Sequence, residues 1–80
     1  MGTYSRKTLE KEFFGKKINF THGTARVIRI KWPSKYNEPE LLIETLDDKG
    51  GLVDRFWRRV WHVRKMFRKA KKEGRLMKDE

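Results

Sequence analysis

The segment at residues 55–72 constrains the fold most, because it combines a regular apolar spacing with an unbroken excess of positive charge. It holds nine Lys or Arg residues and no acid. From residue 53 onward, apolar residues recur at spacings of three and four, the period of one face of an α-helix. They are Val53, Phe56, Val60, Val63, Phe67 and Ala70. The pattern predicts one amphipathic helix over residues 52–72, with its apolar side buried.

The same segment has a second interpretation, in which it begins as a strand. The sequence Asp-Asp-Lys-Gly-Gly at residues 47–51 is a strong turn signal, and Gly50 or Gly51 is expected to adopt positive φ. Residues 52–57 would then pair with residues 41–46 as a hairpin. A turn at Arg58-Arg59 would lead to a last strand over residues 60–63, and the helix would begin near Arg64. Both interpretations place a basic helix over residues 64–72.

The N-terminal part of the chain predicts a short helix followed by strands. Residues 5–14 read as a helix with Ser5 as its N-cap, Gly15 just beyond its end, and Leu9 and Phe13 facing the core. Residues 16–46 then predict a β-meander of three antiparallel strands. Its expected core residues are Ile18, Phe20, Val27, Ile30, Leu42 and Ile43.

Alternation within the second of these strands is imperfect. Ala25 and Val27 fall on one face, whereas Ile28 and Ile30 fall on the other. Either a β-bulge or burial of both faces would account for this pattern. Phe56, Val60 and Phe67 are expected to pack on the meander, and residues 73–80 are expected to fray.

These elements predict a small α+β fold for residues 1–80 as a single domain. Its parts are a short N-terminal helix, an antiparallel β-meander and a basic amphipathic C-terminal helix. The alternative is a five-stranded SH3-like barrel. At 80 residues the chain allows one domain with a small core. We therefore expect the Phe and Trp side chains, including Trp57 and Trp61, to lie inside.

Residues 15–63 resemble small SH3-like barrels of the KOW and Tudor type. The resemblance is carried by GKKINFTHGTARVIRI, in which a strand, a glycine turn and a second strand place G-x-A-x-V in the middle. Trp32-Pro33 stands where such barrels usually have glycines at the end of the second strand. The resemblance implies a barrel, and an association with nucleic acids or with the proteins that act on them.

Catalytic and metal-binding patterns are not found in the sequence. Cysteine is absent, and the two histidines, His22 and His62, are far apart. The acids Asp47 and Asp48 lie in the turn and lack the spacing of a calcium loop. We expect no enzymatic activity, no cofactor and no metal. No stretch approaches the roughly 20 apolar residues of a transmembrane helix, and no signal peptide is recognised, so a cytoplasmic protein is expected.

The charge is concentrated in a way that predicts a polyanionic partner. The net charge is +10, and residues 55–72 contribute +9 of it. The predicted contacts are Arg55, Arg58, Arg59, His62, Lys65, Arg68, Lys69 and Lys72. The first hypothesis is a non-catalytic protein that binds DNA or RNA through phosphates. The alternative is an inhibitor or adaptor, of the kind that a phage encodes, bound to an acidic surface of a host nucleic-acid enzyme. A membrane partner is not expected, because the core needs the aromatic residues.

Overall fold

The first helix begins and ends where its capping residues predict. In the computed structural model, which describes residues 4–79, α1 spans Arg6–Phe13. The Ser5 hydroxyl accepts a hydrogen bond from the backbone amide of Thr8 at 3.2 Å. Gly15 has φ of +77°, the left-handed conformation that commonly follows a helix. The cap assignments from sequence are therefore confirmed.

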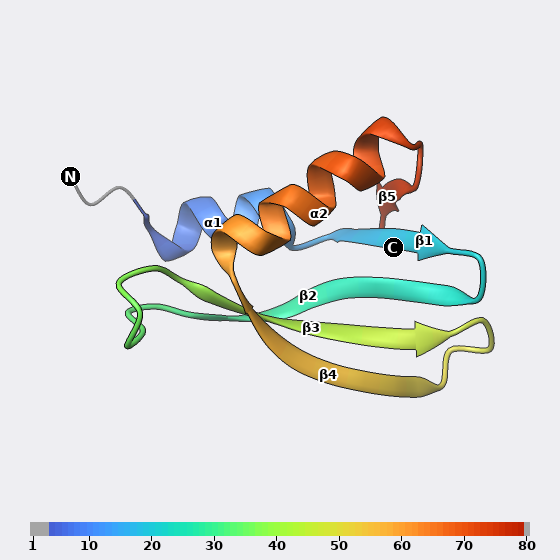
Figure 1. Cartoon of the computed structure of the whole chain (residues 1–80), viewed down its shortest axis with the longest axis horizontal. Coiled ribbons are helices and arrows are strands. Elements are labelled where there is room, and N and C mark those ends of the chain that lie inside the picture. Colours follow the sequence, from blue (N-terminus) through green and yellow to red (C-terminus); the bar gives the residue numbers. More distant parts are fainter. Residues whose placement is uncertain (1–3, 80) are drawn as a thin grey trace.

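Five antiparallel strands follow in a single open sheet (Figure 1), with α2 between the last two. The bounds are β1 Lys16–Phe20, β2 Gly23–Lys31, β3 Glu40–Asp47, β4 Leu52–Arg59, α2 Val60–Lys72 and β5 Leu76–Lys78. The strand order is β4-β3-β2-β1-β5, so β4 and β5 form the two edges. The α+β class is confirmed. The sheet is not closed into a barrel.

A β-bulge in β2 brings its apolar residues onto one face of the sheet. The pairing of β2 with β3 shifts between Val27 and Arg29, so that Val27 lies opposite Ile43 and Ile30 lies opposite Leu41. Residues directly opposite each other in an antiparallel pair share a face. The bulge thus accounts for the irregular alternation of this strand, as one of the two sequence interpretations expected.

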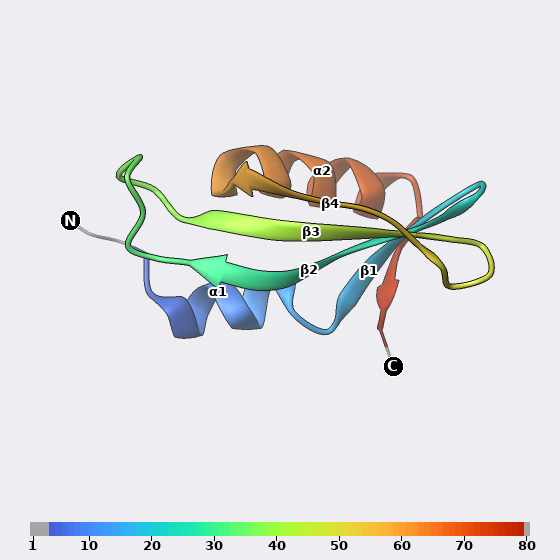
Figure 2. The same ribbon diagram turned by 90° about the horizontal axis from the view of Figure 1, so that it is seen from below.

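Both helices cover this face. Figure 2 shows α1 beside β2 and α2 beside β4. The rings of Phe13 and Phe67 meet edge to face with centroids 5.1 Å apart, which joins the two helices over the sheet. Buried residues of α2 recur at helical spacing and complete the core; they are Val60, Val63, Phe67 and Ala70.

The expected single helix over residues 52–72 is wrong in its first part. Residues 52–59 form β4, which pairs with β3 across the turn where Gly50 has φ of +84°. The alternative is right about this hairpin but wrong about a strand over residues 60–63, because α2 begins at Val60. The amide of Val60 donates to the Pro39 carbonyl at 3.0 Å. A tertiary contact therefore satisfies the first N–H group of this helix.

Two expected core residues lie elsewhere, and the end of the chain is more ordered than expected. Phe20 is 49% exposed and borders an open groove of about 730 Å³ between α2, the β1–β2 turn and the adjacent ends of β3 and β4. Leu42 is only partly buried, because it alternates with Leu41 and Ile43 and faces away from the helices. Residues 76–78, expected to fray, pair with β1 as β5.

Candidate functional site

Arg55 lies on the face of the sheet opposite the helices and is used within the fold. It stands opposite Glu44 in the pairing of β4 with β3. The Glu44 carboxylate is buried and accepts hydrogen bonds from Arg55 at 2.8 and 2.9 Å, and from Arg26 at 3.0 and 3.1 Å. The bonds from Arg55, followed by those from Arg26, lower the pKa of Glu44. Among the ion pairs within residues 4–79, Arg55 is therefore the one predicted contact that the fold itself holds.

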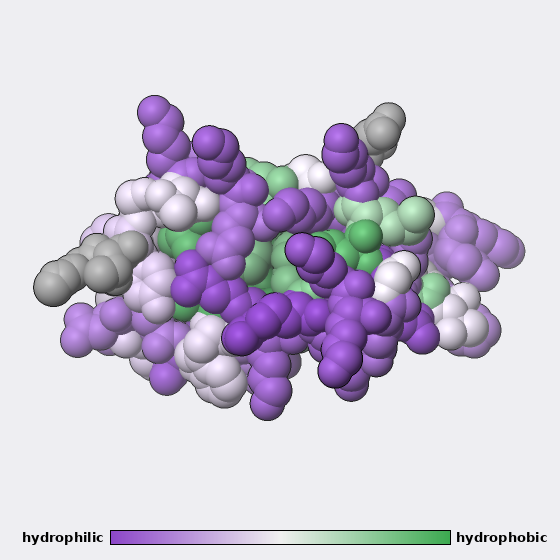
Figure 3. Space-filling view, turned by 90° about the horizontal axis from the view of Figure 1, so that it is seen from above, coloured by the Kyte–Doolittle hydropathy of each residue, from purple (hydrophilic) through white to green (hydrophobic). Residues whose placement is uncertain are grey.

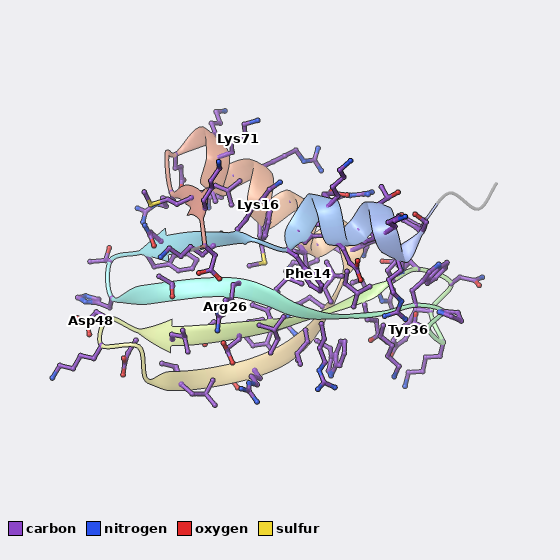
Figure 4. The ribbon with its side chains drawn as sticks, turned by 180° about the vertical axis from the view of Figure 1, so that it is seen from behind. Phe14, Lys16, Arg26, Tyr36, Asp48 and Lys71 are labelled. Atoms are coloured by element: carbon purple, nitrogen blue, oxygen red, sulfur yellow. The ribbon has the colours of Figure 1, made fainter. Side chains whose placement is uncertain are left out.

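Arg58 and Arg59 end β4, and their side chains are exposed. The Arg58 guanidinium lies 4.5 Å from the centroid of the Phe56 ring. That of Arg59 lies 4.1 Å from the centroid of the Tyr36 ring, which belongs to the loop between β2 and β3. Figure 4 shows Tyr36 at the opposite end of the sheet from Asp48 in the β3–β4 turn. The two arginines are thus oriented by aromatic rings rather than by carboxylates.

The solvent side of α2 carries the other predicted contacts. His62, Lys65, Lys69 and Lys72 follow one another at spacings of three and four, and all are exposed. Arg68 and Lys71 are also exposed on this helix, and Lys71 is labelled in Figure 4. We call Lys65, Arg68, Lys69, Lys71 and Lys72 the basic face of α2. Lys71 was not among the predicted contacts, although it follows Arg68 after three residues on the same helix.

Ion pairs separate the basic residues of this segment into two groups. Within residues 4–79, Arg55 pairs with Glu44, and Arg64 pairs with Glu12 at 2.6 Å. The hydrogen bonds that Arg64 donates to the Glu12 carboxylate raise the pKa of Arg64. In the same part of the chain no ion pair involves Arg58, Arg59 or the basic face of α2.

Figure 3 shows the molecule from above, where hydrophilic side chains cover most of the visible surface and an apolar strip lies between them.

The placement of two tryptophans in the core was wrong. Trp57 is 40% exposed and Trp61 is 52% exposed, and Tyr36 is exposed as well. Trp57 lies opposite Leu42 on the face of the sheet that neither α1 nor α2 covers, and Trp61 lies on the solvent side of α2. The sequence did contain one sign that Trp61 is exposed, because this residue lies at the edge of the apolar stripe, next to His62.

These aromatic and basic side chains surround one hollow. Its volume is about 280 Å³, and it lies where β4 passes into α2. We call its aromatic and basic lining the junction cluster. Its members are Tyr36, Trp57, Arg58, Arg59, Trp61 and His62. Arg58, Arg59 and His62 were predicted from the sequence as contacts, whereas the exposure of the three aromatic members was not predicted.

Residues 4–79 show neither a cluster of metal ligands nor a membrane-spanning helix. No three His, Asp or Glu side chains gather in a way that could hold a metal ion. Neither described helix has the length and apolarity needed to cross a membrane. Comparisons of the chain with protein-family models, curated proteins and solved structures found no match.

Proposed function

We propose that this protein is a small non-catalytic nucleic-acid-binding protein that contacts phosphates mainly through the basic face of α2. One observation carries the proposal. The basic face of α2 is exposed, as are the neighbouring Arg58 and Arg59. None of these side chains has a carboxylate partner within residues 4–79. By contrast, Arg55 and Arg64 in the same segment form ion pairs with Glu44 and Glu12. The fold therefore supplies carboxylates to some basic residues of this segment but not to the exposed ones.

The charge pattern on α2 lowers the stability of the helix in the unbound protein. Lys65 is followed by Arg68 and Lys69, and Arg68 is followed by Lys72, all at spacings where helix side chains are neighbours. Like charges at these spacings destabilise a helix, and no acid lies within α2 to offset them. A row of phosphates would remove this repulsion and release counterions, which supports a polyanionic partner.

Charge reversal on α2 tests the proposal. We expect the double variant Lys65→Glu, Arg68→Glu to lose most binding to short DNA and RNA at low salt, measured by fluorescence anisotropy. Both side chains are exposed, so circular dichroism should show an unchanged fold.

The matched control reverses Lys7 and Lys11, which are exposed on α1, and thereby changes the net charge equally. It should retain most of the binding. Equal losses in both variants would mean that total charge, and not this face, sets the affinity. If the wild-type protein binds no nucleic acid at low salt, the proposal is wrong, and an inhibitor or adaptor on an acidic protein surface takes its place.

A further inference from the structure

We infer that the junction cluster is a base-stacking site, so that the nucleic acid bound by this protein is single-stranded. This inference rests on the proposed function and narrows it to one class of ligand. It starts from the three exposed aromatic rings of the cluster, Tyr36, Trp57 and Trp61, which line the same hollow. Single exposed apolar residues are ordinary, but several rings around one hollow mark a contact site.

The rings come from three separate elements, so the cluster is built by the tertiary fold. Tyr36 belongs to the β2–β3 loop, Trp57 to β4 and Trp61 to α2. Two features hold the three elements together at this point. In the strand pairing, Glu40 at the start of β3 lies opposite Arg59 at the end of β4, and the Val60 amide donates a hydrogen bond to the Pro39 carbonyl. The rings are therefore positioned before a ligand arrives.

Cations lie against these rings. Arg59 lies 4.1 Å from the Tyr36 centroid, and Lys31 Nζ lies 5.9 Å from the Trp57 centroid. The Trp61 and His62 rings have centroids 5.0 Å apart with an interplanar angle of 33°. Lys31, Arg58 and Arg59 outnumber the one carboxylate that lines the hollow, that of Glu40, so the charge beside the aromatic surface is positive. A cationic ligand, such as a lysine-rich peptide, would be repelled. A ligand that joins flat rings to negative charge would be attracted on both counts.

Unpaired nucleotides meet both requirements. In a duplex the bases are stacked on one another, whereas an unpaired base exposes its face to an aromatic side chain. Glu40 also lines the hollow, and its carboxylate can accept a hydrogen bond from an amino group on a base edge. A lipid surface fits the site less well, because Arg58, Arg59 and His62 would have to enter the membrane together with the rings.

The cluster also continues directly into the phosphate-binding surface. Trp61 and His62 occupy the first turn of α2, and Lys65 follows His62 after three residues. A strand whose base stacks at the junction can therefore run along the basic face of α2. From Trp61 to its last residue, Lys72, α2 extends about 16 Å away from the stacking site.

Three fluorescein-labelled probes of equal length test the inference: a single strand, its duplex, and an abasic strand that keeps the phosphates but lacks the bases. The wild-type protein should bind the single strand more tightly than the abasic strand, by roughly 5- to 150-fold per stacked base. Trp61→Ala should remove most of this difference, and Trp61→Phe should restore it. Leu52→Ala, at an exposed apolar position at the other end of β4, should leave it unchanged.

Equal affinity for the single strand and the abasic strand would overturn the inference, as would a duplex bound as tightly as the single strand. In both cases the proposed function would stand, because phosphate binding is retained. Absence of binding to all three probes would instead overturn the proposed function. Binding to anionic phospholipid vesicles that is lost in Trp61→Ala, without a preference among the probes, would assign the cluster to a membrane surface.

Discussion

At the scale of single residues, Glu44 is the polar side chain on which the uncovered face of the sheet depends. It is 5% exposed and receives hydrogen bonds from two arginines on neighbouring strands. We expect Glu44→Gln to lower the free energy of unfolding by about 1.5 kcal/mol, the lower end for hydrogen bonds to a charged group, because solvent screens the exposed arginines. Urea denaturation at pH 7 measures this, with the exposed Glu10→Gln as a control that should change little.

The same carboxylate gives a pH dependence of definite sign. The pKa of Glu44 is lowered in the folded protein, mainly by Arg55. Its stabilisation is therefore complete above the unfolded pKa of about 4.3 and is lost as the pH falls through the folded value. Between neutral pH and pH 3 the wild type should lose more stability than Glu44→Gln. Parallel curves for the two proteins would show that Glu44 does not provide this stabilisation.

At the scale of elements, the boundary between β4 and α2 could not be located from the sequence. Val53 and Phe56 continue the three-and-four spacing of Val60 and Val63 by coincidence, although Val53 is 64% exposed in a strand. In the part of the chain that the structure describes, no side chain caps α2, and its first amide donates instead to the carbonyl of Pro39, far away in sequence. The stronger local evidence was the turn at residues 47–51, which predicted the hairpin in the alternative interpretation.

Phe13 and Phe56 should differ in their contribution to stability. Phe13 is fully buried against Phe67, whereas Phe56 in the edge strand β4 is only partly buried. We expect Phe13→Ala to cost about 3–5 kcal/mol. Phe56→Ala should cost roughly 1–2 kcal/mol, because a partly covered ring recovers only part of its transfer free energy. Urea denaturation of both variants measures the difference, and equal costs would place Phe56 in the core.

At the scale of the whole molecule, the basic surface could be predicted from sequence and the aromatic surface could not. Charge is a property of composition, and an acid-free segment remains basic whether it folds as strand or helix. The exposure of Trp57 depends instead on which face of the sheet the helices cover. That depends on the bulge in β2 and on the strand order, which are properties of the tertiary fold.

The division between a basic face and a stacking site predicts two separable responses to salt. If about five unpaired basic side chains contact phosphates, the logarithm of the binding constant should fall against log salt with a slope of about −3.5 on a single strand and −4 to −5 on a duplex. Lys65→Glu, Arg68→Glu removes two contacts and should make the single-strand slope shallower by about 1.4.

Trp61→Ala removes stacking without removing charge. It should therefore weaken binding equally at every salt concentration, giving a line parallel to that of the wild type. Anisotropy titrations between 50 and 200 mM salt, roughly the range in which counterion release is readily measured, separate the two responses. A changed slope in Trp61→Ala would show that this ring acts by positioning the neighbouring charges, and not by stacking.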